Sequence, residues 1–553
     1  MKFSRAVLSR RSRDHRLLLR VASGIGLVSL VAGFLVSHFT ASGSWAPFFD
    51  AVRGVHRLPA IPDLPDPEKA TFADWLQAIR GLDLIDRQTA EEESPAPRVP
   101  VMPAPPEDLA PAPPDFASEL SRLETALIGS ALPEPERQLL LALLHGLLGT
   151  EKAEREAATR ELRSMANATP PRRRAAEFLG DVLERAGDAG GAIDAYRTEV
   201  DRFPAESPRS LHRLATLLRQ EERLTDLEQL MQRPDLRQQF PIRDHIDLAI
   251  DRRDYAALAK WTLLHDLQFH DPWLAVLSLF AAVVWLIIVT QFAGWDRQRL
   301  SLYTLAVGLG WLSATLTLYA VFIQSEIRGF DFDESDDAVQ QILYFVAGVG
   351  LREETLKLLC FLPLVPYLAR RAGENDALVC AGLVGLGFAL NENIGYVDRG
   401  GEFTAWSRFL TANFAHIAWT GIAGLALYRL WRRPRRSWDH FLHDFLIVVA
   451  AHGAYDAFIA VPALGDYSFL SLVIFAASAY WFLDHAADQQ SGSGAMTVSP
   501  IAVFVIGGAL LIGVTFCYAC WAVPFSIAMA EYVRSLAGVV PVAFIFINRF
   551  RHC

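Results

Sequence analysis

The chain has 553 residues, of which 52% are hydrophobic and 21% are charged. This balance, with a mean hydropathy of +0.21, excludes both a disordered chain and an ordinary protein that is soluble throughout. The formal net charge of -10 provides no basic signature for nucleic acid, so we expect no nucleic-acid partner. The averages instead indicate a chain that combines one polar part with one strongly apolar part.

The N-terminal segment 1–44 joins a basic stretch to an apolar run at about 21–39. A membrane-spanning helix needs about 20 consecutive apolar residues, and this run is close to that length. We therefore predict a cytoplasmic basic tail followed by an uncleaved transmembrane anchor. A signal peptide cleaved near Ala41 or Gly43 is the alternative, but the apolar run is long and the cleavage signal is poor.

The segment 45–115 is rich in proline, and nine of the twenty residues from Pro95 to Pro114 are proline. Proline fixes φ and lacks a backbone N–H, so such a stretch is extended rather than folded. We predict a linker here, interrupted by one short helix at about 70–89.

The segment 116–268 has helical periodicity, and its portion 175–204 resembles a tetratricopeptide repeat. Gly180 and Tyr196 stand at the repeat's packing positions. A weaker copy follows 35 residues later, and a third copy around 246–264 matches the repeat pattern poorly. We predict a small helical-repeat domain with a concave surface for docking a peptide or protein. A generic helical bundle without a binding role is the alternative.

The segment 269–553 contains nine further apolar runs that can each span a membrane, which makes ten spans in total. The run at 339–368 is long for one span, and Pro363 and Pro366 can break it. The nine runs lie at about 273–293, 301–323, 339–368, 377–395, 407–431, 441–462, 467–484, 498–523 and 527–548.

Arginine in the short loops predicts the orientation of the spans, because positive charge is retained in the cytoplasm. The clusters at 297–299, 370–371 and 432–436 fall on one side, and the acidic loop 324–338 falls on the other. Both chain ends are then cytoplasmic. We predict a multi-pass protein of the bacterial inner membrane, with residues 45–270 extracytoplasmic.

Ionisable residues inside the predicted spans are candidate site residues, because a charge in the bilayer is costly unless it is paired or hydrated. Residues three or four apart on a helix share a face, so such pairs within this set can meet. The spans that carry them are consecutive, so we expect one shared cavity. The candidates are Glu353, Glu354, Lys357, Glu392, Asn393, His416, His452 and Asp456.

These residue types suit hydrolysis. A glutamate can take the proton from water, and histidine or asparagine can donate to a developing oxyanion. Alternatively, His416, His452 and Glu392 can hold Zn²⁺ and lower the pKa of its bound water. The sequence lacks an HExxH helix motif, the usual signature of a metalloprotease, and apart from zinc we expect no cofactor.

At these residues the chain resembles the PrsW family of bacterial intramembrane proteases, which is related to the group that includes the CAAX-processing enzymes. The resemblance covers about 300–484. Its motifs are EExxK at Glu353-Glu354-x-x-Lys357, FxxxEN at Phe388-x-x-x-Glu392-Asn393, and the later histidine motifs at His416 and His452-x-x-x-Asp456.

The resemblance implies a peptidase in which Glu353 or Glu354 activates water and Lys357 balances their charge. The remaining candidates would complete the site. It also implies a membrane-bound substrate of the anti-sigma-factor type. The large extracytoplasmic repeat segment departs from the compact family pattern and indicates a different or more tightly gated substrate.

Two other functional classes compete with a protease. Chains of carboxylates and histidines also relay protons or ions in transporters, although we see no internal symmetry between 273–395 and 407–548. A scaffold that uses only the helical repeats would leave the buried glutamates unexplained. We therefore predict an all-α protease with a polytopic transmembrane bundle of about ten spans and an extracytoplasmic helical-repeat domain.

Overall fold

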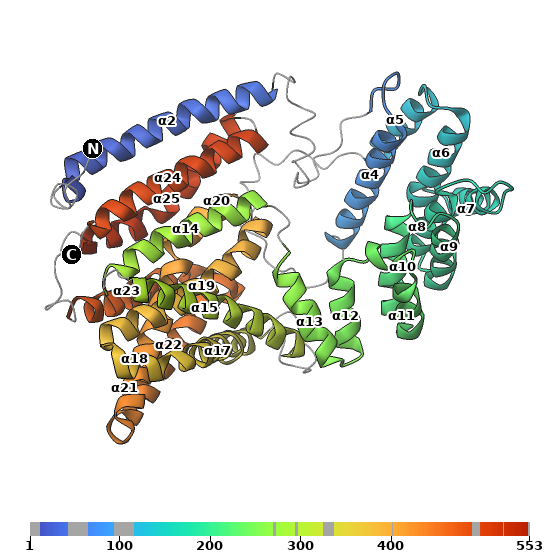
Figure 1. Ribbon diagram of the computed structural model, residues 1–553. Coiled ribbons are helices and arrows are strands. Elements are labelled where there is room, and N and C mark those ends of the chain that lie inside the picture. The colour runs from blue at the N-terminus through green and yellow to red at the C-terminus, as the bar shows by residue number, and fades with distance from the viewer. Residues whose placement is uncertain are drawn as a thin grey trace. The chain divides into compact units, whose positions relative to one another are not determined.

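The computed structural model of the protein is helical, and no β-strand occurs within the residues that it describes (Figure 1). The prediction of an all-α fold is therefore confirmed. The chain divides into two compact units, Val55–Trp261 and Met1–Gly54 with Thr262–Cys553. The described residues are 11–41, 65–92, 116–268, 272–293, 297–324, 337–400, 402–488, 498–523 and 525–550. The predicted proline-rich stretch 95–114 and most of the acidic loop 324–338 lie outside them.

The unit Val55–Trp261 is built from short amphipathic helices joined by tight turns. Its helices are α4 (Phe72–Glu92), α5 (Phe116–Ile128), α6 (Glu134–Leu148), α7 (Lys152–Ala166), α8 (Ala175–Arg185), α9 (Ala189–Arg202), α10 (Pro208–Gln220), α11 (Leu224–Gln232), η2 (Arg237–Gln239), α12 (Ile242–Asp251) and the first part of α13 (Tyr255–Asp266).

Three successive helix pairs, α8–α9, α10–α11 and α12–α13, share the same turn. In each turn one residue takes the left-handed conformation: Gly187 at φ 80°, and Glu222 and Arg253 at φ 55°. The next N–H then donates back to the carbonyl five residues earlier, which is the Schellman geometry that ends a helix. These bonds join Asp188 to Leu183, Arg223 to Leu218 and Asp254 to Ala249, at 2.9, 2.7 and 2.9 Å.

Helix α4 belongs to the core of this unit, although the sequence placed it in the linker 45–115. Trp75 is fully buried in the same apolar cluster as the helices from α5 to α11. The Arg80 guanidinium donates to Glu177 at 2.7 Å and to Asp181 at 3.0 Å, and both carboxylates lie on α8. The folded domain therefore starts before residue 116, because α4 supplies both an apolar face and a cation to it.

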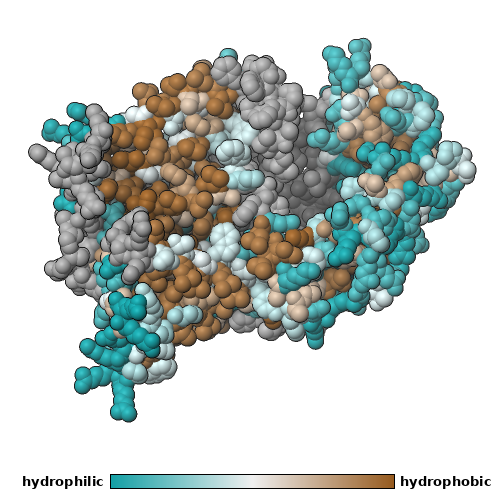
Figure 2. Space-filling view, in the orientation of Figure 1, coloured by the Kyte–Doolittle hydropathy of each residue, from teal (hydrophilic) through white to brown (hydrophobic). Residues whose placement is uncertain are grey.

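The other unit is a multi-pass membrane domain. Eight described helices are long and apolar enough to cross a membrane, and Figure 2 shows hydrophobic side chains gathered on their outer surface. Exposed apolar side chains such as Leu279 and Val514 are expected where lipid is the solvent. The eight segments are His15–His38, Pro272–Thr290, Arg299–Gln324, Glu374–Val397, Thr404–Arg432, Pro434–Ala460, Phe469–Ala487 and Pro500–Trp521.

The predicted count of ten spans is not confirmed. The predicted span 339–368 is not among the eight, because Arg352, Glu353, Glu354 and Lys357 make it strongly charged. It is also not one continuous α-helix, since it contains a π-helical segment at 344–350 and a 3-10 segment at 362–364. The predicted span 527–548 is helical but also outside the eight.

The helices of this unit are α2 (His15–Ala41), α14 (Pro272–Thr290), α15 (Arg297–Gln324), α16 (Ala338–Leu343), η3 (Tyr344–Gly350), α17 (Leu351–Phe361), η4 (Leu362–Leu364), α18 (Val365–Arg371), α19 (Glu374–Gly400), α20 (Glu402–Leu410), α21 (Ala412–Arg432), α22 (Pro434–Ala460), η5 (Pro462–Tyr467), α23 (Phe469–Asp488), α24 (Pro500–Ala522) and α25 (Phe525–Phe550).

An aromatic cluster fastens the last helix to the centre of the bundle. The ring of Trp285 on α14 lies 4.8 Å from that of Phe414 on α21 and 5.0 Å from that of Phe546 on α25. Phe414 and Phe546 are themselves 4.8 Å apart. Helix α2 runs beside α24 on the outside of this core (Figure 1), and Ser37 accepts the backbone N–H of Phe525 at 3.0 Å. The final helices are thus packed against the helix that carries His416.

Candidate active site

The structure brings all eight predicted site residues together on four helices. Glu353, Glu354 and Lys357 lie on α17, Glu392 and Asn393 on α19, His416 on α21, and His452 and Asp456 on α22. A cavity of about 610 Å³ is lined by Glu353, Glu392, His416, His452 and Asp456, among other residues. Glu354, Lys357 and Asn393 are buried behind its wall.

Glycines let the four helices approach closely enough for these side chains to meet. A methyl group on Gly385 of α19 would overlap the carbonyl oxygen of His416 on α21. A methyl group on Gly453 of α22, next to His452, would overlap the backbone of η3 at Val346. The η3 segment is a π-helix that leads directly into α17, and such segments are frequent at functional sites.

Lys357 is a fully buried cation at the centre of the site. Its Nζ donates to Glu354 Oε1 at 2.9 Å, to Glu353 Oε2 at 3.2 Å and to His416 Nδ1 at 2.9 Å. The ammonium also lies 3.8 Å from the ring centroid of Phe388. An ammonium has three protons, and all three are used here. Because His416 Nδ1 accepts one of them, the imidazole carries its own proton on Nε2.

Glu354 orients His452 rather than facing the cavity. His452 Nδ1 donates to Glu354 Oε1 at 2.9 Å, and Thr420 Oγ1 donates to Glu354 Oε2 at 3.2 Å. This arrangement holds His452 with its Nε2 turned to Asp456 Oδ2 at 3.4 Å and Glu353 Oε2 at 3.6 Å. A buried carboxylate that fixes an imidazole in this way is typical of histidines that serve as ligands or as donors. The neighbouring glutamates therefore occupy different positions, with Glu353 at the cavity and Glu354 behind it.

Arg408 is a site residue that the sequence reasoning missed. Its Nη2 donates to Glu392 Oε2 at 2.7 Å, and its Nε donates to the side-chain oxygen of Asn393. The guanidinium also stacks 3.9 Å from the ring centroid of Tyr396. Asn393 in turn donates to Asn413 at 2.8 Å. An arginine at the start of an apolar run is the signal that could have indicated it.

Glu392 connects Arg408 to the histidine cluster. Its Oε2 accepts from Arg408 and also lies 3.1 Å from His416 Nε2, the nitrogen that carries the proton. The carboxylate is therefore engaged by a cation and by an imidazole N–H. Glu392 therefore orients the His416 ring through this hydrogen bond.

Three buried residues are placed to hold a metal ion. One ligand atom from each of Glu353, His416 and His452 lies within 4.8 Å of the others. This set differs from the predicted set in its carboxylate, which is Glu353 in place of Glu392. Two imidazole nitrogens and one carboxylate oxygen form the ligand set of many catalytic zinc sites, so these residue types fit zinc. Because His416 Nδ1 is engaged by Lys357, His416 would bind a metal through Nε2, which would first release its proton.

The apolar helices enclose a cluster of glutamates and histidines, residue types that suit hydrolysis. Residues 298–482, about a third of the chain, match the family model described as PrsW family intramembrane metalloprotease. The matched range contains all eight predicted site residues and supports the resemblance seen in the sequence. No curated protein and no solved structure matches the chain.

Proposed function

We propose that this protein is an intramembrane peptidase that hydrolyses a peptide bond of a membrane protein at the cavity lined by Glu353, His416 and His452. One observation carries the proposal. A carboxylate and two imidazoles converge within 4.8 Å of one another among helices that can span a membrane. The family match over 298–482 supports the same class of reaction.

Glu353 is the proposed proton acceptor. Its Oε2 contacts Lys357 and His452, which leaves Oε1 to bind a water molecule in the cavity. The water oxygen attacks the peptide carbonyl carbon while Glu353 takes its proton, and the glutamic acid then returns that proton to the leaving amine. The Lys357 ammonium at 3.2 Å stabilises the carboxylate form between these steps.

The donors that face the same cavity suit the developing oxyanion. The guanidinium of Arg408 lines it, and the Nε2–H of His416 lines it as long as no metal is bound to that nitrogen. Donors that are already held in place stabilise such charge without reorganisation. Glu353, His416 and His452 would hold a zinc ion, which when bound supplies a Lewis acid and lowers the pKa of the attacking water.

Metal content and cleavage together test this proposal. We expect the full-length protein, purified in detergent with zinc supplied, to hold about one zinc ion per chain and to cleave a synthetic single-span peptide. His416→Ala and His452→Ala should lose both properties. His443→Ala is the matched control, because His443 lies on the same helix as His452 but is exposed. Metal binding is measured by elemental analysis.

Two other outcomes would contradict the proposal in part or in whole. Cleavage by a protein that holds no zinc would show that no metal is needed and that Glu353 activates water directly. If the folded wild-type protein cleaves no single-span peptide, the peptidase proposal itself is wrong.

The proposed location is the bacterial inner membrane, with residues 45–270 extracytoplasmic, and the arginine clusters in the short loops support it. The three helix pairs with a common turn support a tetratricopeptide-like domain that recruits or restricts the substrate. A cysteine introduced at exposed Lys152 should react with a membrane-impermeant thiol reagent in whole cells permeabilised only at the outer membrane. Deletion of 116–265 should alter the substrate range, and an unchanged range would contradict the recruiting role.

A further inference from the structure

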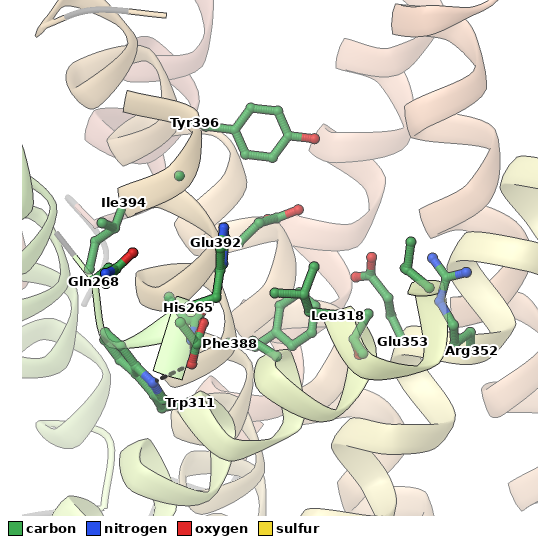
Figure 3. Close-up of a pocket in the computed structure, with 16 residues that line it drawn as sticks. His265, Gln268, Trp311, Leu318, Arg352, Glu353, Phe388, Glu392, Ile394 and Tyr396 are labelled. Atoms are coloured by element: carbon green, nitrogen blue, oxygen red, sulfur yellow. Dashed lines mark hydrogen bonds between the residues drawn. The ribbon is translucent and has the colours of Figure 1, made fainter. Parts of the chain in front are cut away.

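A second cavity of about 610 Å³ adjoins the site, between the end of α13 and the helices α15, α17 and α19 (Figure 3). Neither of the two histidines of the candidate site is among the residues that line it. The two cavities share four lining residues: Arg352, Glu353, Glu392 and Tyr396. A peptide that passes the Glu353 carboxylate can therefore extend into one cavity on each side of it.

The wall of the second cavity that α15 supplies is mostly apolar, and Thr317 is the one polar residue of that helix in the lining. Trp311, Ala314, Leu318 and Val321 recur at steps of three and four along that helix, so they form one stripe on its face. Phe388 of α19 lines the same cavity. A volume of this size lies in the range of small-ligand pockets and exceeds what one side chain needs.

One end of this wall is held rigidly by Asp266. Its Oδ2 accepts the indole N–H of Trp311 at 3.0 Å, drawn as a dashed line in Figure 3. Asn391, the residue before Glu392, donates to both oxygens of Asp266 at 2.8 Å. The orientation of the Trp311 ring is thus fixed from the helix that carries Glu392. A fixed ring makes a selective wall, because the pocket cannot widen without breaking these bonds.

The junction of the two cavities is polar, and Arg352, Glu353 and Glu392 line both cavities there. The Nη1 of Arg352 donates to Gln324, which holds the guanidinium in place. A peptide main chain has carbonyl and N–H groups that can pair with such side chains, whereas a lipid acyl chain has none. The occupant that suits both the apolar stripe and this polar junction is a segment of polypeptide.

We propose that this second cavity binds the side chain of a substrate residue next to the scissile bond and selects a bulky aliphatic residue there. The inference rests on the proposed peptidase function and adds to it the class of residue that the enzyme recognises. Transmembrane segments are rich in leucine, isoleucine and valine, so a substrate drawn from the bilayer supplies such a side chain. The Glu353 carboxylate, at the boundary between the cavities, then faces the peptide bond beside that residue.

The test uses the full-length protein in detergent and a synthetic single-span peptide whose cleaved bond is located by mass spectrometry. The residues on either side of that bond are varied to alanine or leucine. Wild-type protein should prefer leucine on one side by about 10-fold or more in kcat/KM, as hydrophobic pockets do. Leu318→Trp, which fills the cavity, should abolish this preference while still cleaving the alanine peptide. Leu318→Ala should extend the preference to phenylalanine.

Leu316→Trp is the matched control, because Leu316 lies on the same helix but is exposed and lines neither cavity. Continued cleavage of the alanine peptide shows that each variant is folded. Unchanged leucine preference in both Leu318 variants would overturn this inference and leave the peptidase function intact. If wild-type protein cleaves none of the peptides, the proposed function has failed, and this inference fails with it.

Discussion

Glu353→Gln is expected to lower kcat/KM for a single-span peptide by about 10²-fold to 10⁴-fold, the contribution usual for a general base. Glutamine keeps the shape of the side chain but cannot accept the proton of water. The fold should survive, because Lys357 keeps Glu354 as a partner at 2.9 Å. Cleavage is followed by mass spectrometry, and folding is followed by thermal unfolding in detergent.

Glu374→Gln is the control for this substitution. Glu374 lies at the start of α19, pairs with Arg429 at 2.6 Å and is substantially exposed. It should leave cleavage nearly unchanged. Retention of full activity by Glu353→Gln would show that another group activates water, and Asp456 on the cavity wall would become the next candidate.

Lys357→Met is expected to lower the free energy of unfolding by about 3–5 kcal/mol, the cost typical of removing one member of a buried ion pair. The substitution leaves Glu353 and Glu354 buried without their cation, and His416 loses the donor to its Nδ1. Chemical unfolding in detergent measures the change. Lys152→Met, at a residue that is 85% exposed, is the control.

A second substitution identifies the cause of this loss. Adding Glu354→Gln to Lys357→Met removes one of the unpaired carboxylates, so part of the lost stability should return. Both variants should be inactive, because both lack the Lys357 ammonium that stabilises the Glu353 carboxylate. If the double variant is less stable than Lys357→Met alone, the loss comes from packing around the lysine rather than from unpaired charge.

The candidate site could be predicted in composition but not in arrangement. Charged residues inside apolar runs are conspicuous in a sequence, and their order along consecutive helices matched a known family pattern. The separate positions of Glu353 and Glu354 were not predictable, because each depends on what faces α17. Glu354 meets Thr420 and His452, which lie 66 and 98 residues away along the chain.

Arg408 and the metal ligand set illustrate the same limit. The sequence placed 396–406 in a loop and did not include Arg408 among the site residues. The structure folds 402–410 into α20, from which Arg408 reaches Glu392 and Asn393. Glu353, and not the predicted Glu392, is the carboxylate whose oxygen lies within 4.8 Å of the two histidines. No periodicity or spacing signals a pairing of this kind.

By itself, the sequence determined that the protein is helical, that much of it lies in a membrane and that eight polar residues inside the apolar half form a candidate site. These properties follow from hydropathy and from the helical repeat, which depend on residues close together in the chain. The tertiary structure alone decided that α4 joins the core, which glutamate faces the cavity and that a second cavity meets the first at Glu353. Such features arise from contacts between distant segments, and packing rather than local pattern sets them.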